Sequence, residues 1–334
     1  MSTGSGTVAV PRIIGELRGK PRGAAGGRMV LPNPNDRRTI CPWRLGTRTL
    51  ELGGRTLIMG VVNITPDSFS DGGLFLDPEA AVTHGVRLID EGADLLDLGA
   101  ESTRPGSRAG GDSPAVGAEE EQARLLPVLE GILKARPHAV VSVDTYKAAT
   151  ARVALKAGAA LINDVSGFTW DAELAGVCAE ARCGVVLMHT RGKPDEWRTQ
   201  PQLEGDALID LVRSGLAGSL AIAAGAGIAP EAIVLDPGYG FGKRFGENFS
   251  LLARQGELLM LGRPLLAGLS RKSFLGHALA TLHGGKSAPV DARATASLAA
   301  MVTAILQGAS VVRVHDVRPA VEVARVVDEV LDAG

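Results

Sequence analysis

Short apolar runs alternate with longer amphipathic runs eight times after residue 56, and this alternation constrains the fold more than any other feature of the chain. The short runs have the length of strands, and the longer runs place apolar residues at helical spacing. The predicted strands are Leu57–Asn63, Asp94–Gly99, Ala139–Asp144, Ala160–Asp164, Val185–His189, Ala232–Asp236, Pro264–Leu269 and Val311–His315. The predicted helices are Pro78–Glu91, Ala118–Ala135, Tyr146–Ala157, Asp171–Ala181, Glu204–Ala224, Asn248–Gln255, Ala292–Leu306 and Pro319–Leu331. Strands that alternate with helices run parallel, with right-handed crossovers.

Three junctions between a predicted helix and the next strand repeat one pattern. Glu91-Gly92-Ala93, Ala157-Gly158-Ala159 and Gln307-Gly308-Ala309 each place glycine where a helix ends, and glycine is the usual residue for a left-handed helix end. Eight such units fit an α/β fold of the (β/α)8 TIM-barrel type, for which ~250 residues are typical. A doubly wound open sheet is the alternative, and the strand count favours the barrel.

The first 40 residues differ in composition from the rest of the chain. They contain seven Gly, four Pro, seven Lys or Arg and two acidic residues, without apolar periodicity. This predicts a flexible basic tail over residues 1–40 and one barrel domain over residues 41–334, with a nucleic-acid arm or a targeting segment as the alternative interpretation of the tail. Gly53-Gly54 separates Thr49–Leu52 from Thr56–Val62, which predicts a short N-terminal hairpin between these two runs.

Composition excludes several classes of protein. A hydrophobic content of 45% with 22% charged residues supports a buried core, which excludes a largely disordered chain. The net charge of −2 and the small number of aromatic residues (3 Trp, 2 Tyr and 7 Phe) argue against a nucleic-acid partner. The least polar stretches, Ser214–Ala229 and Thr295–Val312, contain Gly, Ser or Gln, so we expect buried helix and strand there and no membrane span.

Cysteine usage and the N-terminal residues predict a cytoplasmic protein. Cys41, Cys178 and Cys183 form no C-x-x-C motif and are expected to be reduced thiols. The first 30 residues lack the apolar core and cleavage site of a secretory signal.

Each predicted strand ends in residues that can do chemistry. They are Asn63, Asp97 with Glu101, Asp144, Asn163 with Asp164, His189, Asp236, Ser270 with Lys272, and Arg313 with His315. In a parallel barrel all carboxyl ends lie on one face, which carries the active site. A lone polar residue after a strand is more often a cap or a turn former, the role expected for Asp77, Thr145 and Asp171. Polar ends on all eight strands instead predict one shared site.

Acids, an amide and cations occur together in this set. The carboxylates of Asp144 and Asp236 and the Asn163 amide suit the amino-pyrimidinone edge of a planar ligand. The arginine and histidine that end the last strand suit a phosphate, and Asn63 with nearby oxygens suits Mg²⁺, which bridges phosphates. The glycine-rich segment Gly238–Lys243 is expected to let the backbone pass close to a ligand. The chain has no HExxH or GxSxG motif, which argues against a zinc protease or an α/β-hydrolase.

Eight motifs of the chain resemble those of the dihydropteroate synthase family. They are MGVVNITPDSFSDGG (Met59–Gly73), ESTRPG (Glu101–Gly106), SVDTYK (Ser142–Lys147), INDVSG (Ile162–Gly167), LMH-x-RG (Leu187–Gly192), DPGYGFGK (Asp236–Lys243), GLSRKS (Gly268–Ser273) and RVHDV (Arg313–Val317). The resemblance runs from about Gly53 to the C-terminus. It implies a pterin-binding TIM barrel, a homodimer in most members, that condenses 6-hydroxymethyl-7,8-dihydropterin pyrophosphate with para-aminobenzoate. The products would be 7,8-dihydropteroate, a folate precursor, and pyrophosphate, with Mg²⁺ as the cofactor.

The resemblance also implies roles for individual residues. The pterin would be held by Asp144, Asn163, Asp236 and Lys272. Para-aminobenzoate would be flanked by Thr103, Pro105, Phe241 and Ser270. The pyrophosphate would be bound by Arg104, Arg313 and His315, and Mg²⁺ would be coordinated by Asn63. The catalytic residues would be Asp144, Lys272 and Arg313, in an SN1-like reaction in which pyrophosphate leaves first and the loops Asn63–Gly73 and Ser102–Ala115 close over the pterin cation.

Three other functions remain as alternatives. A methyltransferase that passes a methyl group from a folate to a corrinoid would keep the pterin residues, but it would not need ESTRPG, SRKS and RVHDV. A catalytically silent paralogue would bind pterin only, and the intact carboxylates, Lys272 and Arg313 argue against it. A structural or interaction protein would not need eight polar strand ends. One residue departs from the family pattern, because Thr190 stands where many members carry Met.

Overall fold

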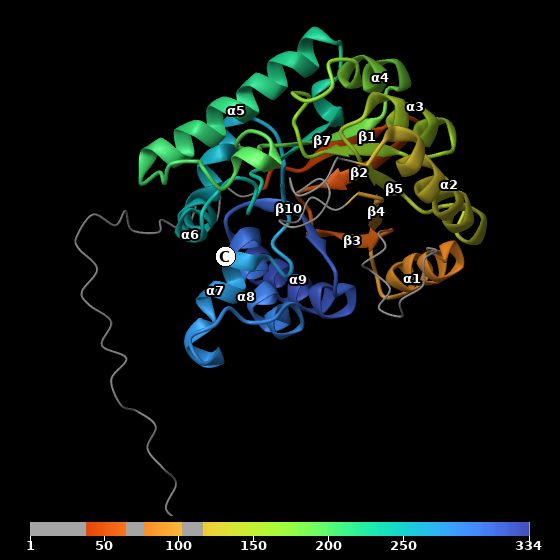
Figure 1. The fold of residues 1–334 in the computed structure, drawn as a ribbon. Coiled ribbons are helices and arrows are strands. Elements are labelled where there is room, and N and C mark those ends of the chain that lie inside the picture. Colours follow the sequence, from red (N-terminus) through yellow and green to blue (C-terminus); the bar gives the residue numbers. More distant parts are fainter. Residues whose placement is uncertain (1–37, 65–76, 102–115, 334) are drawn as a thin grey trace, which may run out of the picture. The chain divides into compact units, whose positions relative to one another are not determined.

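The computed structural model describes residues 38–64, 77–101 and 116–333. Eight parallel strands close into a barrel in the order β10-β3-β4-β5-β6-β7-β8-β9 (Figure 1). The barrel strands are β3 (Leu57–Asn63), β4 (Leu95–Gly99), β5 (Val141–Asp144), β6 (Leu161–Asp164), β7 (Gly184–Met188), β8 (Ile233–Asp236), β9 (Leu265–Ala267) and β10 (Ala309–Val314). The eight predicted strands and the TIM barrel are confirmed, and the open-sheet alternative is wrong.

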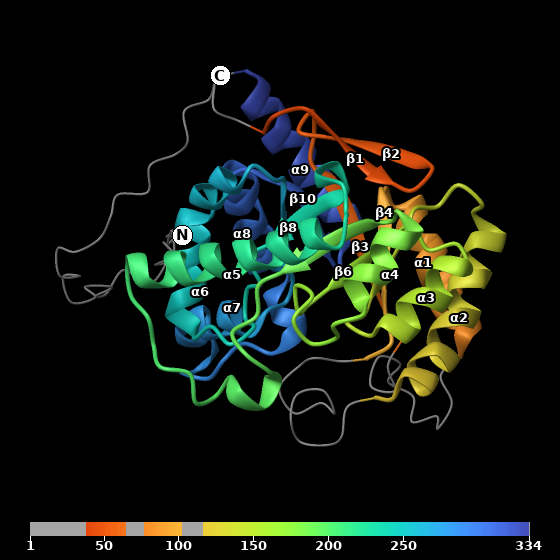
Figure 2. The ribbon, with the colours of Figure 1, turned by 90° about the horizontal axis from the view of Figure 1, so that it is seen from above.

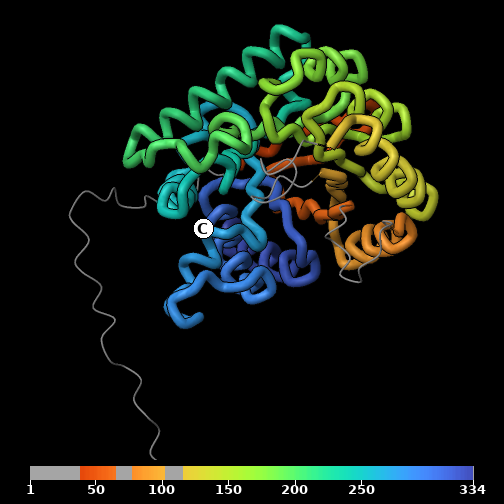
Figure 3. Tube along the Cα trace, in the orientation of Figure 1, coloured from red at the N-terminus to blue at the C-terminus, as the bar shows by residue number. Residues whose placement is uncertain are grey.

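Helices surround the barrel in sequence order, from α1 to α9 (Figure 3). They are α1 (Pro78–Asp90), α2 (Ala118–Ala135), α3 (Ala148–Lys156), α4 (Leu174–Ala181), α5 (Asp206–Gly225), α6 (Phe245–Arg254), α7 (Ser273–Ala278), α8 (Ala294–Leu306) and α9 (Val317–Asp332). The prediction missed α7, because a helix of 6 residues is too short to show a periodic apolar pattern.

The junctions between elements use the residues that the sequence indicated. Gly92, Gly158 and Gly308 follow their helices with φ of +107°, +107° and +89°, a backbone region that favours glycine. The carboxylate of Asp77 accepts a hydrogen bond from the Glu79 amide at 2.9 Å and caps α1.

The N-terminal hairpin exists, but its strands are not the predicted ones. β1 (Cys41–Leu45) pairs with β2 (Arg48–Leu52) in antiparallel register, whereas residues 57–63 form β3, which pairs in parallel with β4 and β10. The prediction of a hairpin between Thr49–Leu52 and Thr56–Val62 is therefore wrong. The physical reason is visible in burial: residues 57–62 are all buried, as in a central parallel strand, whereas β1 alternates between exposed and buried side chains.

The hairpin closes the amino-terminal end of the barrel. Trp43, Leu45 and Leu52 are buried in a cluster with apolar side chains from the barrel strands, including Leu57 and Leu95 at the first positions of β3 and β4. The Trp43 indole Nε1 donates a hydrogen bond to the Ala232 carbonyl at 3.0 Å. Figure 2 shows the hairpin at one end of the barrel. The carboxyl ends of the strands are at the opposite end.

The two least polar stretches lie largely as expected. Residues 295–312 form most of α8 and the start of β10. Residues 214–229 are helical only to Gly225, and β8 begins after them, at Ile233. Within the described residues, α5 alone is long and apolar enough to span a membrane by length and composition, and its Val212 and Leu216 side chains pack into the core of the barrel.

Most of the predicted tail, residues 1–37, lies outside the described residues. The first described residue, Arg38, pairs with Asp328 of α9 at 2.6 Å.

Replacing Trp43 should destabilise the protein without altering its chemistry. Trp43→Ala leaves a cavity under the hairpin, so we expect the free energy of unfolding in urea to fall by about 3–5 kcal/mol. Ile40→Ala, at an exposed position, is the control and should change the free energy of unfolding by less than about 0.5 kcal/mol. A loss below about 1 kcal/mol for Trp43→Ala would mean that the hairpin does not seal the barrel.

Candidate active site

Strand register places the polar strand ends side by side. Asn63 of β3 is aligned with Gly99 of β4, Gly99 with Asp144 of β5, and Asp144 with Asn163 of β6. On the far side of the barrel, Asp236 of β8 is aligned with Met188 of β7. Polar residues that are far apart in the sequence therefore surround one opening, as predicted.

A buried carboxylate connects these side chains. Asp97 is fully buried, and its Oδ2 accepts hydrogen bonds from Arg313 Nε at 2.6 Å and from Asn163 Nδ2 at 3.0 Å. Arg313 Nη2 donates a further bond to Asp144 Oδ2 at 3.0 Å. One network thus joins β4, β5, β6 and β10. Asp97 Oδ1 is buried without a partner among the described residues.

Asp144 is the member of this network with the most perturbed titration. Burial and the neighbouring Asp97 carboxylate raise the pKa of Asp144 to about 7, although Arg313 opposes the shift. A carboxyl group with a pKa near neutrality changes charge easily when a ligand of either sign approaches.

Asp236 ends β8, on the opposite side of the barrel from this network, and Lys272 follows β9. Asp236 is 6% exposed, and its Oδ1 accepts a hydrogen bond from the Gly238 amide at 2.7 Å. Burial raises the pKa of Asp236, whereas the Gly238 bond and the charge of Lys272 lower it. The Lys272 ammonium lies 4.1 Å from the ring centroid of Phe241, a cation–π contact.

A cavity of about 390 Å³ lies at the carboxyl ends of the strands. Its lining includes Asn63, Glu101, Asp144, Trp197, Phe241, Ser270, Lys272, Ser273, Arg313 and His315. Ser270 lies beside His315, because its Oγ accepts a hydrogen bond from the His315 amide at 3.2 Å and is 3.0 Å from Nδ1.

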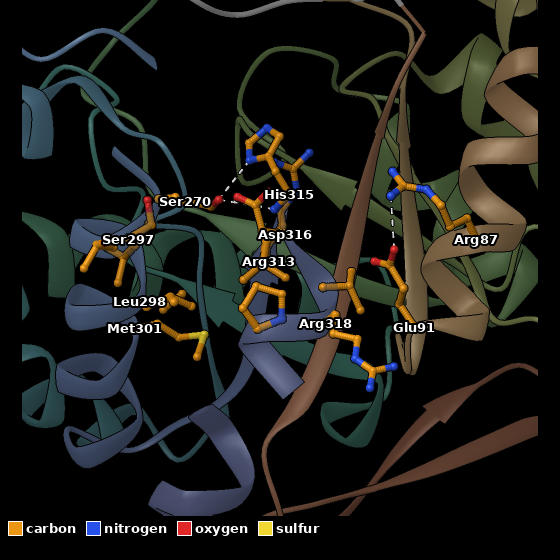
Figure 4. Close-up of a pocket in the computed structure, with 17 residues that line it drawn as sticks. Arg87, Glu91, Ser270, Ser297, Leu298, Met301, Arg313, His315, Asp316 and Arg318 are labelled. Carbon is orange, nitrogen blue, oxygen red and sulfur yellow. Dashed lines mark hydrogen bonds and ion pairs between the residues drawn. The ribbon is translucent and has the colours of Figure 1, made fainter. Parts of the chain in front are cut away.

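A second cavity of about 370 Å³ shares Ser270, Arg313 and His315 with the first. Figure 4 shows these three side chains together with Ser297, Leu298 and Met301 of α8. It also shows the ion pair between Arg87 of α1 and Glu91, the residue that follows this helix. Arg313 and His315 therefore lie between the two cavities.

The oxygen donors at the mouth suit a metal only in part. The described residues contain no group of three His, Cys, Asp or Glu side chains that could hold a metal ion. Asn63 and Glu101 line the cavity, but the two carboxylate oxygens of Glu101 accept hydrogen bonds from the Val116 amide and the Lys147 ammonium. Mg²⁺ retains several waters and is often completed by substrate phosphates, so the Asn63 amide oxygen fits Mg²⁺ that arrives with a phosphorylated ligand.

The structure brings together most of the predicted site residues. Asn63, Asp144, Phe241, Ser270, Lys272, Arg313 and His315 line the cavity. Asn163 is tied to this group through Asp97, and Asp236 lies behind Gly268, where a Cβ atom would be 3.8 Å from its Oδ2. Thr103, Arg104 and Pro105, and the predicted closing loops over residues 65–73 and 102–115, lie outside the described residues.

Two residues of the site were missed by the role assignments made from the sequence. Asp97 stood among the polar strand ends without a role, although an acid inside the apolar run LLDLG is a signal of a buried partner. Trp197 follows a single 3-10 turn, Pro194–Glu196, and meets Phe241 edge to face at 5.3 Å. No periodic pattern marks that turn.

The raised pKa of Asp144 should appear in the pH dependence of stability. Between about pH 4 and 7 the folded protein binds a proton at Asp144 that the unfolded chain releases, so this residue makes stability fall as pH rises through that window. Asp144→Asn should flatten the fall, measured by urea unfolding at pH 5 and pH 7. Asp332→Asn, at the exposed end of α9, is the control. Equal slopes for Asp144→Asn and the unsubstituted protein would contradict the assignment.

Comparisons with known proteins agree with this geometry. A family model described as "Pterin binding enzyme" matches residues 59–315. The dihydropteroate synthase of Bacillus subtilis is 39% identical over 280 residues, which cover 84% of this chain and 90% of that protein.

Solved structures give the same result. The Xanthomonas albilineans dihydropteroate synthase with 4-aminobenzoic acid has a TM-score of 0.76 and 40% identity, over 87% of this chain and 98% of that one. A structure of that enzyme with 7,8-dihydropteroate has a TM-score of 0.72 and 38% identity, over 86% and 98%. The chain belongs to the pterin binding enzymes and, within them, to the dihydropteroate synthase family.

Proposed function

We propose that this chain condenses 6-hydroxymethyl-7,8-dihydropterin pyrophosphate with para-aminobenzoate to give 7,8-dihydropteroate and pyrophosphate. Family membership supports the reaction. The observation that carries it is Arg313, whose guanidinium is held by two carboxylates and also lines the cavity. A cation fixed in this way suits a leaving group that gains negative charge.

The pterin is proposed to bind at the deep carboxylates. Asp144, Asn163 and Asp236 offer acceptors to the N–H groups of an amino-pyrimidinone ring, and Lys272 offers a donor. Because Asn163 gives one N–H to Asp97, its carbonyl oxygen is oriented away from that carboxylate and can accept from a ligand. When pyrophosphate departs, the positive charge on the pterin would be stabilised by the ionised form of Asp144.

Para-aminobenzoate is proposed to bind nearer the mouth. Phe241 offers an apolar wall there, and Ser270 a hydroxyl, on the same cavity as Lys272. Thr103 and Pro105 belong to this proposal through the family motif alone. The amine of para-aminobenzoate would attack the pterin carbon that pyrophosphate has left, and its proton would be released to solvent.

The pyrophosphate is proposed to bind to Arg313 and His315, with Arg104 from the family motif. Nε and Nη2 of Arg313 are engaged by Asp97 and Asp144, which leaves Nη1 without a partner among the described residues. Asn63 would hold Mg²⁺ together with the phosphate oxygens. When bound, the metal would neutralise charge on the leaving group.

The proposal extends to a cytoplasmic homodimer. The three cysteines are free thiols, which suits a reducing compartment. Phe245 and Phe249 of α6 are 46% and 40% exposed, and apolar side chains of this size favour a surface covered by another subunit. Light scattering that gave a mass near 34.5 kDa would contradict the dimer.

A coupling assay tests the function. The protein is incubated with Mg²⁺, dihydropterin pyrophosphate and labelled para-aminobenzoate, and dihydropteroate is separated by chromatography. We expect product that depends on both substrates and falls sharply when a chelator removes Mg²⁺. Pterin binding by calorimetry without any product would instead favour a silent paralogue or a methyltransferase.

Arg313 should be essential for turnover. Arg313→Ala removes the cation beside the leaving group, so kcat should fall about 10²–10³-fold. Arg325→Ala, the same change of charge at an exposed position of α9, should leave kcat within twofold. A loss of less than threefold for Arg313→Ala would remove Arg313 from the pyrophosphate site.

A further inference from the structure

A buried lysine that the proposed mechanism does not use lies behind the cavity. Lys243 is in the loop between β8 and α6, and it is only 6% exposed. Its ammonium forms no ion pair with a described residue. Instead it donates to three backbone carbonyls: Gly238 at 2.7 Å, His189 at 3.2 Å and Phe241 at 3.4 Å. The three N–H donors of an ammonium match three acceptors.

These carbonyls come from two different loops. The His189 carbonyl belongs to the end of β7, whereas the Gly238 and Phe241 carbonyls belong to the loop after β8. The two loops are in close contact, because a Cβ atom on Gly238 would lie 1.9 Å from the His189 oxygen. Gly238, Gly240 and Gly242 have φ of +71°, +85° and +70°, the left-handed region that lets this loop coil. Lys243 thus links His189, which follows β7, to the loop that follows β8.

The opposite side of the same loop is braced by Asn248 of α6. Its Oδ1 accepts from the Gly240 amide at 2.6 Å, and its Nδ2 donates to the Lys243 carbonyl at 3.1 Å and to the Arg244 carbonyl at 2.7 Å. Lys243 and Asn248 therefore satisfy the loop's carbonyls and amides from two directions. Phe241 lies between these anchored positions.

The loop presents Phe241 to the cavity. The Phe241 ring contacts the Lys272 ammonium at 4.1 Å and the edge of Trp197 at 5.3 Å. Gly240 passes close to the aliphatic part of Lys272, where a Cβ atom would lie 3.5 Å from Cδ. The position of this aromatic wall therefore depends on how the loop is held from behind.

Keeping an ammonium in this place is unfavourable on its own. Burial lowers the pKa of Lys243 to about 7, which shows that the charged form is disfavoured by loss of water. A methionine would fill similar space without that cost. The fold nevertheless places three carbonyls around the nitrogen, which an apolar side chain would leave without a donor.

We propose that Lys243 is a positioning residue that holds Phe241 against the cavity and thereby sets the affinity for para-aminobenzoate. The proposal rests on the proposed function for its substrate. Asp144 and Asn163 are held by Asp97 and Arg313 instead, so these two pterin residues should not depend on Lys243. Asp236 does contact the same loop, through the Gly238 amide, so the effect on the pterin should be smaller than the effect on para-aminobenzoate and not zero.

The test is Lys243→Met, which keeps an unbranched side chain and removes the three donors. We expect KM for para-aminobenzoate to rise about tenfold, because a small displacement of the wall that binds it weakens binding. KM for dihydropterin pyrophosphate should rise by a smaller factor, because only Asp236 among the deep pterin residues contacts this loop. Phe241→Leu should show the same split. In the double variant the two effects should not add, because Lys243 acts through Phe241.

A second readout does not require activity. The Trp197 indole should be quenched more strongly by acrylamide in Lys243→Met, because Phe241 no longer covers its edge. The Trp197 signal is the difference between the fluorescence of each protein with Trp197 and that of the same protein carrying Trp197→Phe. If the unsubstituted protein makes no dihydropteroate, the proposed function fails, but this measurement still decides the role of Lys243. Unchanged quenching together with unchanged or equally raised KM values would overturn the proposal.

A variant on the other brace covers the case in which Lys243→Met does not fold. Asn248→Ala releases the same loop from α6 and should give the same split in KM and the same rise in quenching. A variant that unfolds at lower temperature, but has the KM values and the acrylamide quenching of the unsubstituted protein, would show that these side chains only stabilise the fold.

Discussion

The fully buried carboxylate of Asp97 is the constraint around which the site is organised. A charge away from water is tolerated only when it is paired and hydrogen-bonded, and Arg313 and Asn163 supply that compensation. Each of these side chains also faces the region where ligands are proposed to bind. The charges of the site are therefore interdependent, because a substitution at one of these positions changes the surroundings of side chains on the other strands of the network. Asp144, with its raised pKa, is where this interdependence is most visible.

A similar arrangement exists on the other half of the barrel, but there the partners are backbone groups. Lys243 and Asn248 hold a glycine-rich loop through carbonyls and amides. One half is thus fixed by side-chain charges and the other by loop geometry. In the proposed assignment the pterin contacts both halves, through Asp144 and Asn163 on the first and Asp236 on the second, whereas the described residues assigned to para-aminobenzoate include Phe241 of the loop that Lys243 and Asn248 hold.

The sequence predicted the parts of this structure that depend on local pattern. All eight barrel strands followed from continuous apolar runs, and the shared site followed from the polar residue at each strand end. The hairpin partner was wrong because Gly53-Gly54 is a local turn signal, whereas burial of residues 57–62 in the barrel is decided by distant strands. The roles of Asp97 and Lys243 depend on strand register and on carbonyls from separate loops, and neither is encoded in spacing along the chain. The roles assigned from family motifs stay predictions until the variants are measured.

The hairpin at the amino-terminal end has a kinetic consequence. Because Trp43, Leu45 and Leu52 close that end, ligands reach the polar strand ends from the opposite end of the barrel. In the proposed assignment the pterin lies at the depth of Asn163 and Asp236, so it has to enter before a molecule that rests on Phe241. A structural plug far from the chemistry would in this way impose a compulsory order on the substrates.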